Sequence, residues 1–464
     1  MSSSFLVVAL ALQAAPAPEQ SPPAAETLIS RAQQSRGAYA LLTDLVDSVG
    51  PRLSGSEGAA AAVAWAVERF TALGLEVHKE PVLVPVWVRG LEQGEVLAAP
   101  GRRVHALALT ALGGSPGTHR GGLEAEVVEV TSLSDLQERG PSVRGRIVFF
   151  NHSMAVAKDY RRFGELRSKG PEAAAKLGAV GALVRSLATA SMRSPHTGMT
   201  QFTEGAVLIP AAAVSVEDAE MLHRLLGAGT VRVRFALGCR ILPDALSFNV
   251  VADLRGREHP EEVVLLGAHL DSWDLAVGAQ DDGAGVALVV ETARLLAGLP
   301  ERPRRTVRFV LFMNEENGLR GAKTYALAHA RELGHHVAAM EFDAGAGRPL
   351  GVALLAGAGA SSLLEAWLPP LVQLGAGTLL QEDAGGADLS PMAGAQVPLV
   401  SVVQDTMHYF DIHHSAADTL DKVEPEGFSQ TSAAAAWLTY ALAESTAVLP
   451  RPAPPAAATP SSAR

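Results

Sequence analysis

Two nearly continuous apolar runs with a helical pattern between them constrain the fold most. Residues 262–269 read Glu-Val-Val-Leu-Leu-Gly-Ala-His, and residues 306–313 read Thr-Val-Arg-Phe-Val-Leu-Phe-Met. Such runs are typical of strands buried on both faces, as in a parallel sheet. Between them, apolar residues recur at helical spacing from Val286 to Leu296, and Pro300 ends the pattern. This order predicts an α/β fold, with a mixed, mostly parallel sheet flanked by helices.

Imidazole and carboxylate side chains gather where these predicted strands end. They are His269, Asp271, Asp281, Asp282, Glu315 and Glu316. Asp343 ends another strand-like run, and His413 and His414 follow a strand-like segment at 398–403. Open α/β sheets build their sites beyond the carboxyl ends of their strands. Together these residue types predict a site for hydrolytic metal ions.

Neighbouring acidic residues have different expected roles. Asp281 can bridge two cations with its two oxygens, whereas an imidazole such as His269 ligates one. Asp271 is expected to lie behind His269 and fix its tautomer as a hydrogen-bond acceptor. Asp282 is expected mainly to cap the following helix, a common role for aspartate.

The adjacent pair Glu315 and Glu316 suits a division of labour in hydrolysis. One carboxylate can ligate a metal while the other takes a proton from water. An isolated Glu-Glu pair is more often a solvated acidic turn. The other acidic and histidine residues at strand ends favour the catalytic interpretation here.

Several motifs carry a family resemblance over most of the chain. They are His-Leu-Asp-Ser-Trp-Asp at 269–274, Gly-Ala-Gln-Asp-Asp-Gly at 278–283, Asn-Glu-Glu at 314–316, Glu-Phe-Asp at 341–343 and His-Ser-Ala-Ala-Asp-Thr at 414–419. Upstream, 49–56 and 84–90 fit the same pattern. The chain resembles the co-catalytic zinc aminopeptidase and glutamate carboxypeptidase family, which implies a zinc-peptidase fold of the phosphorylase/hydrolase-like type.

The resemblance implies two zinc ions and a role for each motif residue. By position, His269 and Asp343 would hold one ion and Glu316 and His414 the other. Asp281 would bridge the two. Glu315 would be the general base, and His413 stands where some relatives place an oxyanion-stabilising side chain. A ligand set of nitrogen and oxygen also tolerates cobalt or manganese.

The implied activity is exopeptidase hydrolysis of dipeptides or of terminal residues of short peptides, and the resemblance also suggests a homodimer. A single-zinc enzyme resembling glutaminyl cyclase is one alternative. A receptor-like binding protein that has lost its metal ligands is another, but every ligand position here is filled. Metal stoichiometry and a cyclisation assay distinguish the first alternative.

The sequence predicts an interrupted catalytic domain. Residues 24–100 would form its N-terminal part, with extended sequence adding to its sheet, and 243–446 the rest. The segment 101–242 contains none of the proposed ligands, and its strand, helix, strand, strand pattern resembles a protease-associated domain. The tail 447–464 is rich in proline and alanine and is expected to be disordered.

Charge, the N-terminal apolar segment and cysteine content indicate the cellular compartment and exclude some binding partners. The net charge of −11 argues against nucleic acid or an anionic membrane as partner. An apolar segment at 5–12, followed by small residues, predicts a signal peptide over 1–17 that is cleaved after Ala14 or Ala17 and is too short to span a bilayer. Cys239 is the sole cysteine, so no intrachain disulfide can form. We therefore expect a secreted or periplasmic protein without a membrane span.

Overall fold

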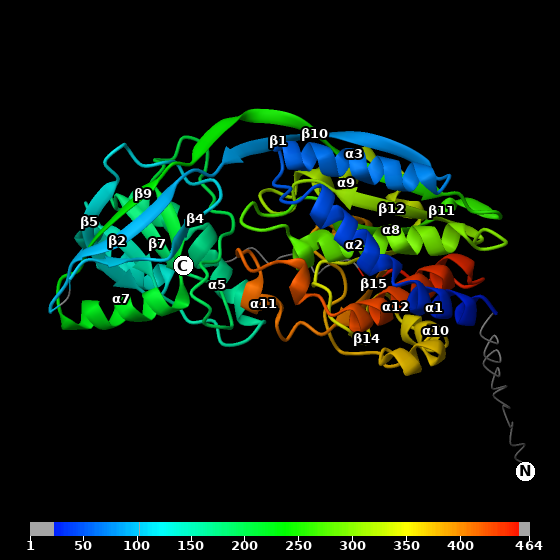
Figure 1. Ribbon diagram of the computed structural model, residues 1–464. Helices are drawn as coiled ribbons and strands as arrows, with labels where there is room; N and C mark the ends of the chain where they lie inside the picture. The colour runs from blue at the N-terminus through cyan, green and yellow to red at the C-terminus, as the bar shows by residue number, and fades with distance from the viewer. Residues whose placement is uncertain (1–22, 102, 454–464) are drawn as a thin grey trace, which may run out of the picture.

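The computed structural model describes residues 23–101 and 103–453, and these form two lobes, each built on one sheet (Figure 1). The strands of the first sheet are β1 (Glu76–Val88), β10 (Arg240–Leu254), β11 (His259–His269), β12 (Arg305–Phe312), β13 (His336–Glu341), β14 (Pro349–Leu355) and β15 (Leu399–Gln404). The predicted signal peptide lies outside the described residues. In the described ranges, the helices are all too short or too polar to traverse a lipid bilayer.

The first sheet is mixed, as the sequence predicts. Its strand order is β1-β10-β12-β11-β13-β15-β14. The central strands β12, β11, β13 and β15 are parallel, whereas β1, β10 and β14 pair antiparallel with their neighbours. The expected parallel arrangement therefore applies to the centre of the sheet, where the long apolar runs lie.

Helices cover both faces of this sheet. One face carries α1 (Pro23–Ser35), α2 (Gly37–Ser48), α3 (Glu57–Ala72), α8 (Ala284–Ala297) and α12 (Pro425–Glu444), and the other carries α9 (Arg320–Ala328). Short helices α10 (Ala360–Glu365) and α11 (Tyr409–Ile412) lie in the loops around β14 and β15. In β11, Val264 and Leu266 pack in the hydrophobic core on the face that α8 and α12 cover, whereas Leu265 packs with Tyr325 of α9 in the core on the opposite face. This alternation along one strand explains the continuous apolar run.

The second lobe has its own sheet and core. Its strands are β2 (Glu92–Ala98), β3 (His105–Ala106), β4 (Leu109–Ala111), β5 (Leu123–Val130), β6 (Ile147–Phe150), β7 (Gly181–Arg185), β8 (Ala211–Val214) and β9 (Arg232–Leu237). Their order is β3-β2-β9-β5-β6-β7-β8-β4. The helices are α4 (Leu133–Arg139), α5 (Asp159–Ser168), α6 (Gly170–Lys176) and α7 (Val216–Ala228). The predicted strand, helix, strand, strand pattern corresponds to β6, α6, β7 and β8. Its identity as a protease-associated domain stays a prediction.

The boundary between the lobes differs from the expected one. We expected the extended sequence up to residue 100 to join the catalytic sheet, and β1 does so by pairing with β10. The strand β2 instead pairs with β9 in the second sheet. The chain leaves and returns at one point, where a Cβ on Gly90 would clash with the main chain of Gly238. Strand propensity cannot show which sheet a strand joins.

The loop after β11 locks the two lobes together. Trp273 packs in the core of the second lobe, where a Cβ on Gly113 would clash with its ring. Next to it, Asp274 accepts hydrogen bonds from Arg89 Nη2 at 2.6 Å and Nε at 2.9 Å. A bidentate, largely buried ion pair fixes geometry as well as charge. The second lobe is therefore anchored directly beside His269.

The prediction of a disordered tail is wrong for residues 447–453. Leu449 is buried, and Arg451 donates to the carbonyl oxygens of Leu333, His336 and Ala395. These main-chain acceptors lie far from the tail in sequence, so composition alone could not indicate them. The rest of the predicted tail, from residue 454, lies outside the described residues.

Candidate active site

The predicted site residues meet beyond the carboxyl ends of the central strands. His269 is the last residue of β11, Glu315 and Glu316 follow β12, and Asp343 follows β13. Asp281 comes from the loop before α8, and His413 and His414 come directly after α11. The strand-end rule that places ligands at one edge of a parallel sheet therefore accounts for the location of the site.

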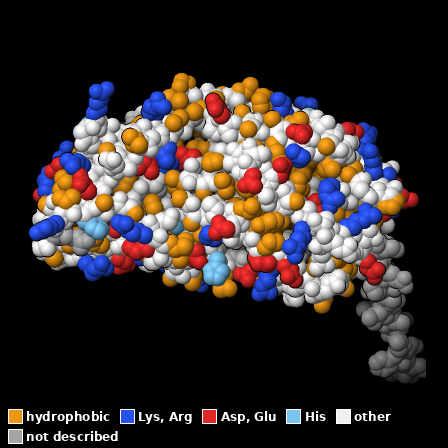
Figure 2. Space-filling model, in the orientation of Figure 1, with side chains coloured by type: hydrophobic (Ala, Val, Ile, Leu, Met, Phe, Trp, Pro, Cys, Tyr) orange, Lys and Arg blue, Asp and Glu red, His pale blue; other side chains and the backbone are white. Residues whose placement is uncertain are grey.

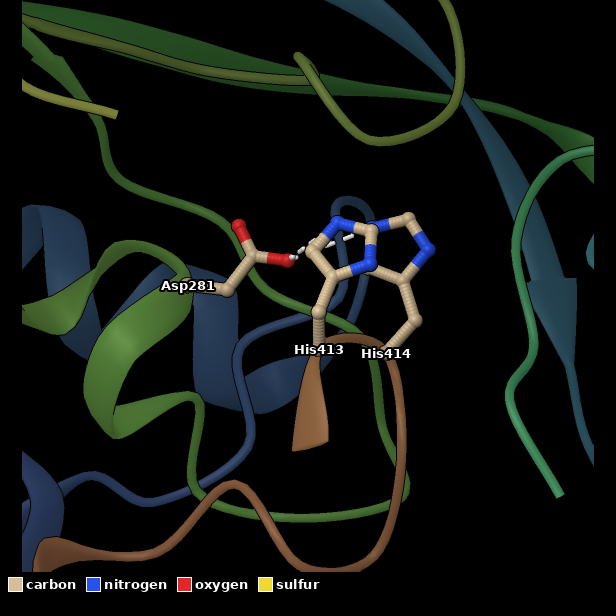
Figure 3. Close-up of side chains that lie close together, drawn as sticks. All are labelled: Asp281, His413 and His414. Carbon is tan, nitrogen blue, oxygen red and sulfur yellow. Dashed lines mark ion pairs between the residues drawn. The ribbon is translucent and has the colours of Figure 1, made fainter. Parts of the chain in front are cut away.

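Asp281 lies at the centre of this group. Its Oδ1 is 3.2 Å from His269 Nε2. Its Oδ2 is 3.3 Å from His413 Nε2 and 3.2 Å from His414 Nε2, and it accepts no hydrogen bond (Figure 3). The two oxygens thus face different imidazoles, which is the arrangement that a bridging carboxylate requires.

The first ligand group centres on His269. Its Nδ1 lies 2.9 Å from the main-chain oxygen of Asp271. Because a carbonyl oxygen can only accept, Nδ1 carries the proton and Nε2 presents its lone pair. Nε2 lies 3.2 Å from Asp281 Oδ1 and 3.4 Å from Asp343 Oδ1. One nitrogen and two carboxylate oxygens therefore converge.

The role expected for the Asp271 side chain is wrong in its detail. The main-chain carbonyl, and not the carboxylate, orients His269. The carboxylate instead accepts from the backbone N–H groups of Asn314 at 2.6 Å and Glu315 at 3.1 Å. The turn after β11 brings the carbonyl to the ring, a contact that residue type does not encode. Asp271 thereby anchors the loop that carries Glu315.

The second ligand group joins Glu316 to His414. Glu316 Oε2 is 2.9 Å from His414 Nε2, and Oε1 accepts from the Trp273 backbone N–H at 3.2 Å. Burial, and then the charge of Asp281, raises the pKa of Glu316 to about 7. The ring of His413 stacks on His414 with centroids 3.6 Å apart. Both histidines lie close to Asp281, and His414 also contacts Glu316, the one glutamate predicted as a ligand.

Glu315 and Asp282 occupy distinct positions beside the ligand groups. Glu315 lines the cavity, and burial raises the pKa of its carboxyl well above the usual range. Asp282 Oδ1 accepts from the Gly285 N–H at 2.9 Å, which confirms the predicted helix cap. Its Oδ2 also accepts from the backbone N–H of His269 at 3.1 Å. Asp282 therefore joins the start of α8 to the end of β11.

The donor set fits metal ions. The candidate ligand atoms of His269, Asp281 and Asp343 lie within 4.8 Å of one another, as do those of Asp281, His413 and His414. Several carboxylates are crowded together out of water, and uncompensated burial of like charges is strongly unfavourable. Cations would favour the ionised forms and lower the raised pKa values. Tetrahedral nitrogen and oxygen ligation is typical of zinc.

The site opens into a cavity of about 810 Å³. Its wall includes Tyr160, Arg161 and Arg167 from α5, which sequence reasoning did not select. Their position depends on lobe docking, for which the sequence carries no local signal. Glu341 and Asp388 were also missed: Glu341 accepts from the Asp388 N–H, and burial raises its pKa to about 7. The acidic end of β13 was the available signal for Glu341.

Arg52 fixes the loop that leads from β11 to Asp281. It is fully buried and donates to the carbonyl oxygens of Leu270 at 3.0 Å, Gly278 at 3.1 Å and Val277 at 2.6 Å. Its backbone N–H donates to Ser272 Oγ at 3.1 Å. One guanidinium thus holds both ends of the loop between β11 and Asp281. Its charge also lies near the acidic cluster.

Replacing Arg52 by Met is expected to destabilise the protein by about 3–5 kcal/mol, because buried carbonyl groups lose their donors and buried carboxylates lose a nearby positive charge. Urea unfolding measures the change. Arg302→Met is the matched control because Arg302 is exposed. Equal unfolding midpoints for the two variants would contradict the supporting role of Arg52.

Comparisons with known proteins identify the family of this chain. The sequence profile of peptidase family M28 matches residues 249–439. Carboxypeptidase Q of Homo sapiens is 38% identical over 416 residues, which cover 89% of this chain and 87% of that protein. The chain belongs to peptidase family M28. The resemblance drawn from the motifs is therefore confirmed. Within the family, the same motifs are most like those of plasma glutamate carboxypeptidase, also called carboxypeptidase Q, and the identity to the human protein agrees with this.

Solved structures support the same assignment. The peptidase M28 precursor from Shewanella amazonensis SB2B is 40% identical and superposes with a TM-score of 0.88 over 93% of this chain and 98% of that one. A zinc aminopeptidase from Bacillus subtilis shares the fold, with a TM-score of 0.62 at 19% identity over 87% of this chain and 95% of that one. The carboxypeptidase Q relatives do not favour the glutaminyl cyclase or receptor alternatives.

Proposed function

We propose that this M28 protein is a secreted or periplasmic exopeptidase that uses two zinc ions to hydrolyse dipeptides or the terminal residues of short peptides. The observation that carries the proposal is the Asp281 carboxylate, whose two oxygens face two separate groups of ligand side chains. Cobalt and manganese are possible substitutes for zinc with this donor set. The relatives named carboxypeptidase Q support an exopeptidase activity.

The ligands are assigned to two sites with one shared residue. His269 and Asp343 would hold one ion, Glu316 and His414 the other, and Asp281 both. Bound zinc would lower the pKa of water and polarise the scissile carbonyl. Hydrogen bonds behind the ligands keep them oriented, as the Asp271 carbonyl does for His269 and the Trp273 N–H does for Glu316.

Glu315 is the proposed general base. Its carboxylate takes a proton from the attacking water and returns it to the amine that leaves. The Asp271 carboxylate holds the backbone of Glu315 in place by accepting a hydrogen bond from its N–H at 3.1 Å. His413 is the proposed donor to the developing oxyanion, since its Nδ1 is buried and has no hydrogen-bond partner.

The second lobe contributes to the wall of the cavity through which substrate would reach the site. The side chains of α5 line the cavity, which supports a role for this lobe as a protease-associated domain that walls the cleft. Acidic and basic side chains are interspersed over the face drawn in Figure 2, which suits small peptides better than nucleic acid as partners. A homodimer is part of the proposal by analogy with the family.

Metal removal and restoration test the proposal. Chelation is expected to abolish hydrolysis of free dipeptides, and two equivalents of zinc per chain are expected to restore it. Cobalt and manganese would be compared in the same assay. Cyclisation of an N-terminal glutamine by a protein with one zinc would instead support the glutaminyl cyclase alternative. Full dipeptide turnover in the chelated protein would overturn the metal assignment.

A further inference from the structure

The proposed ligand His414 has a backbone conformation that is uncommon for residues other than glycine. Its φ is 59°, in the left-handed region. Such a conformation persists only where the surrounding contacts determine it. The contacts that hold the His414 backbone therefore also decide whether its imidazole faces the second ligand group.

One of these contacts comes from the second lobe. The His414 carbonyl accepts a hydrogen bond from the Thr197 N–H at 2.8 Å. Thr197 is itself fixed to that lobe, because its Oγ1 donates to the carbonyl of Ala111 in β4 at 2.8 Å. The next residue, Gly198, accepts from the Gly113 N–H at 3.0 Å. The backbone of His414 is thus tied to the β4 edge of the second sheet.

Two aromatic rings border the imidazole. Tyr160 of α5 lies edge-on to His413 and His414, with ring centroids 4.9 Å and 6.4 Å away. Trp273 lies edge-on to His414 at 5.7 Å, and it packs in the core of the second lobe. Tyr160 and Trp273 therefore confine the imidazole only while the second lobe is docked.

The two proposed ion sites differ in their dependence on this lobe. In the second site, Glu316 accepts from the backbone N–H of Trp273 at 3.2 Å, so this carboxylate is also linked to a residue buried in the second lobe. In the first site, the main-chain oxygen of Asp271 orients His269, and Asp343 follows β13. The first site is therefore built on the central strands of the first sheet, and the second is shared between the lobes.

We propose that docking of the second lobe completes the second metal site, an inference that rests on the proposed two-zinc function. Thr197 and Tyr160 are positioning residues that act through His414. Without their contacts, the His414 backbone relaxes out of the left-handed region and its imidazole moves away from Asp281 and Glu316. Affinity for the second zinc ion thus depends on the second lobe, whereas affinity for the first does not.

Removal of the Thr197 N–H tests this directly. Thr197→Pro is expected to weaken binding of the second zinc ion by about 10- to 100-fold, the usual effect of losing a group that orients a ligand, and to leave the first unchanged. Zinc titration of the metal-free protein against competing chelators, with elemental analysis, measures both affinities. Glu204→Pro is the matched control in the same segment and is expected to bind both ions as wild type does. Glu204 is exposed and precedes Gly205, whose φ is 79°, in a turn that accommodates proline.

A change in α5 tests the same inference without altering the backbone. Tyr160→Leu is expected to weaken the second ion by about 2- to 10-fold, the usual contribution of an aromatic contact. Tyr160→Phe keeps the ring and is expected to keep both affinities. This pair decides the question if circular dichroism shows that Thr197→Pro is unfolded.

His414→Ala identifies the ion that is lost. This variant is expected to bind one zinc ion with the affinity that Thr197→Pro retains. Adding Thr197→Pro to it is expected to change that affinity by less than about twofold, because the residue through which Thr197 acts is already absent. Equal weakening of both ions by Thr197→Pro, or unchanged binding of both, would overturn the inference. Wild-type protein that binds fewer than two zinc ions would instead overturn the proposed function.

Discussion

Glu315→Gln is expected to lower kcat for dipeptide hydrolysis by about 10²–10⁴-fold, the usual contribution of general acid–base catalysis. Glutamine keeps the size of the side chain but cannot accept the proton from water. The backbone hydrogen bond from Glu315 to Asp271 does not depend on the side chain, so the local fold stays intact. Steady-state kinetics measure the loss, and elemental analysis is expected to find wild-type zinc.

Glu382→Gln is the matched control for this change. Glu382 lines the same cavity and is exposed, and it contacts none of the proposed ligands. Its variant is expected to keep wild-type kcat. A zinc-loaded Glu315→Gln protein with substantial activity would remove Glu315 from the role of general base.

Asp281→Asn is expected to weaken zinc binding by more than about 100-fold and to abolish activity. Groups that only orient a ligand already contribute about 10–100-fold to metal affinity, and a shared ligand should exceed that. A neutral amide offers one oxygen and no charge in place of two anionic oxygens. Dialysis followed by elemental analysis measures the bound metal.

Asp282→Asn separates ligation from helix capping. Asp282 accepts from the N–H groups of Gly285 and His269, and an amide can replace one of these bonds. The variant is expected to keep zinc and to lose about 1–3 kcal/mol of stability, the cost of one unsatisfied buried group. Retained zinc in Asp281→Asn together with an empty Asp282→Asn protein would reverse the assignment within the pair.

The meeting of the proposed ligands at one place could be predicted because it follows from a short-range pattern. The apolar run of β11 shows a buried strand, and the residue at its carboxyl end must then lie at the edge of the sheet where His269 is found. The same reasoning holds for Glu316 after β12 and Asp343 after β13. Residue chemistry already favoured Asp281 as a bridge, and family resemblance added the pairing of the other proposed ligands with the two ions.

The rest depends on contacts between distant segments. The carbonyl that orients His269, the acceptors that hold the tail at Arg451 and the sheet that β2 joins are all decided by tertiary packing. Arg167 is the clearest case, because a basic residue in an amphipathic helix is usually solvated. Its place in the cavity wall is set by contacts with Tyr160, Thr197 and His414, which are distant from one another in sequence order and cannot be read from it.

The crossing point at Gly90 and Gly238 has a consequence for the order of folding. The ladder between β1 and β10 joins Val88 to Arg240, although the whole second lobe lies between them in sequence. Closing so long a loop directly has a large entropic cost and would slow folding. Pairing of β2 with β9 and the hydrogen bond from Gly238 N–H to the Leu91 carbonyl at 2.8 Å hold the two ends close together, so prior folding of the second lobe would lower this cost. We therefore expect the second lobe to fold before the β1–β10 ladder closes, so that the sheet carrying the proposed ligands is completed last.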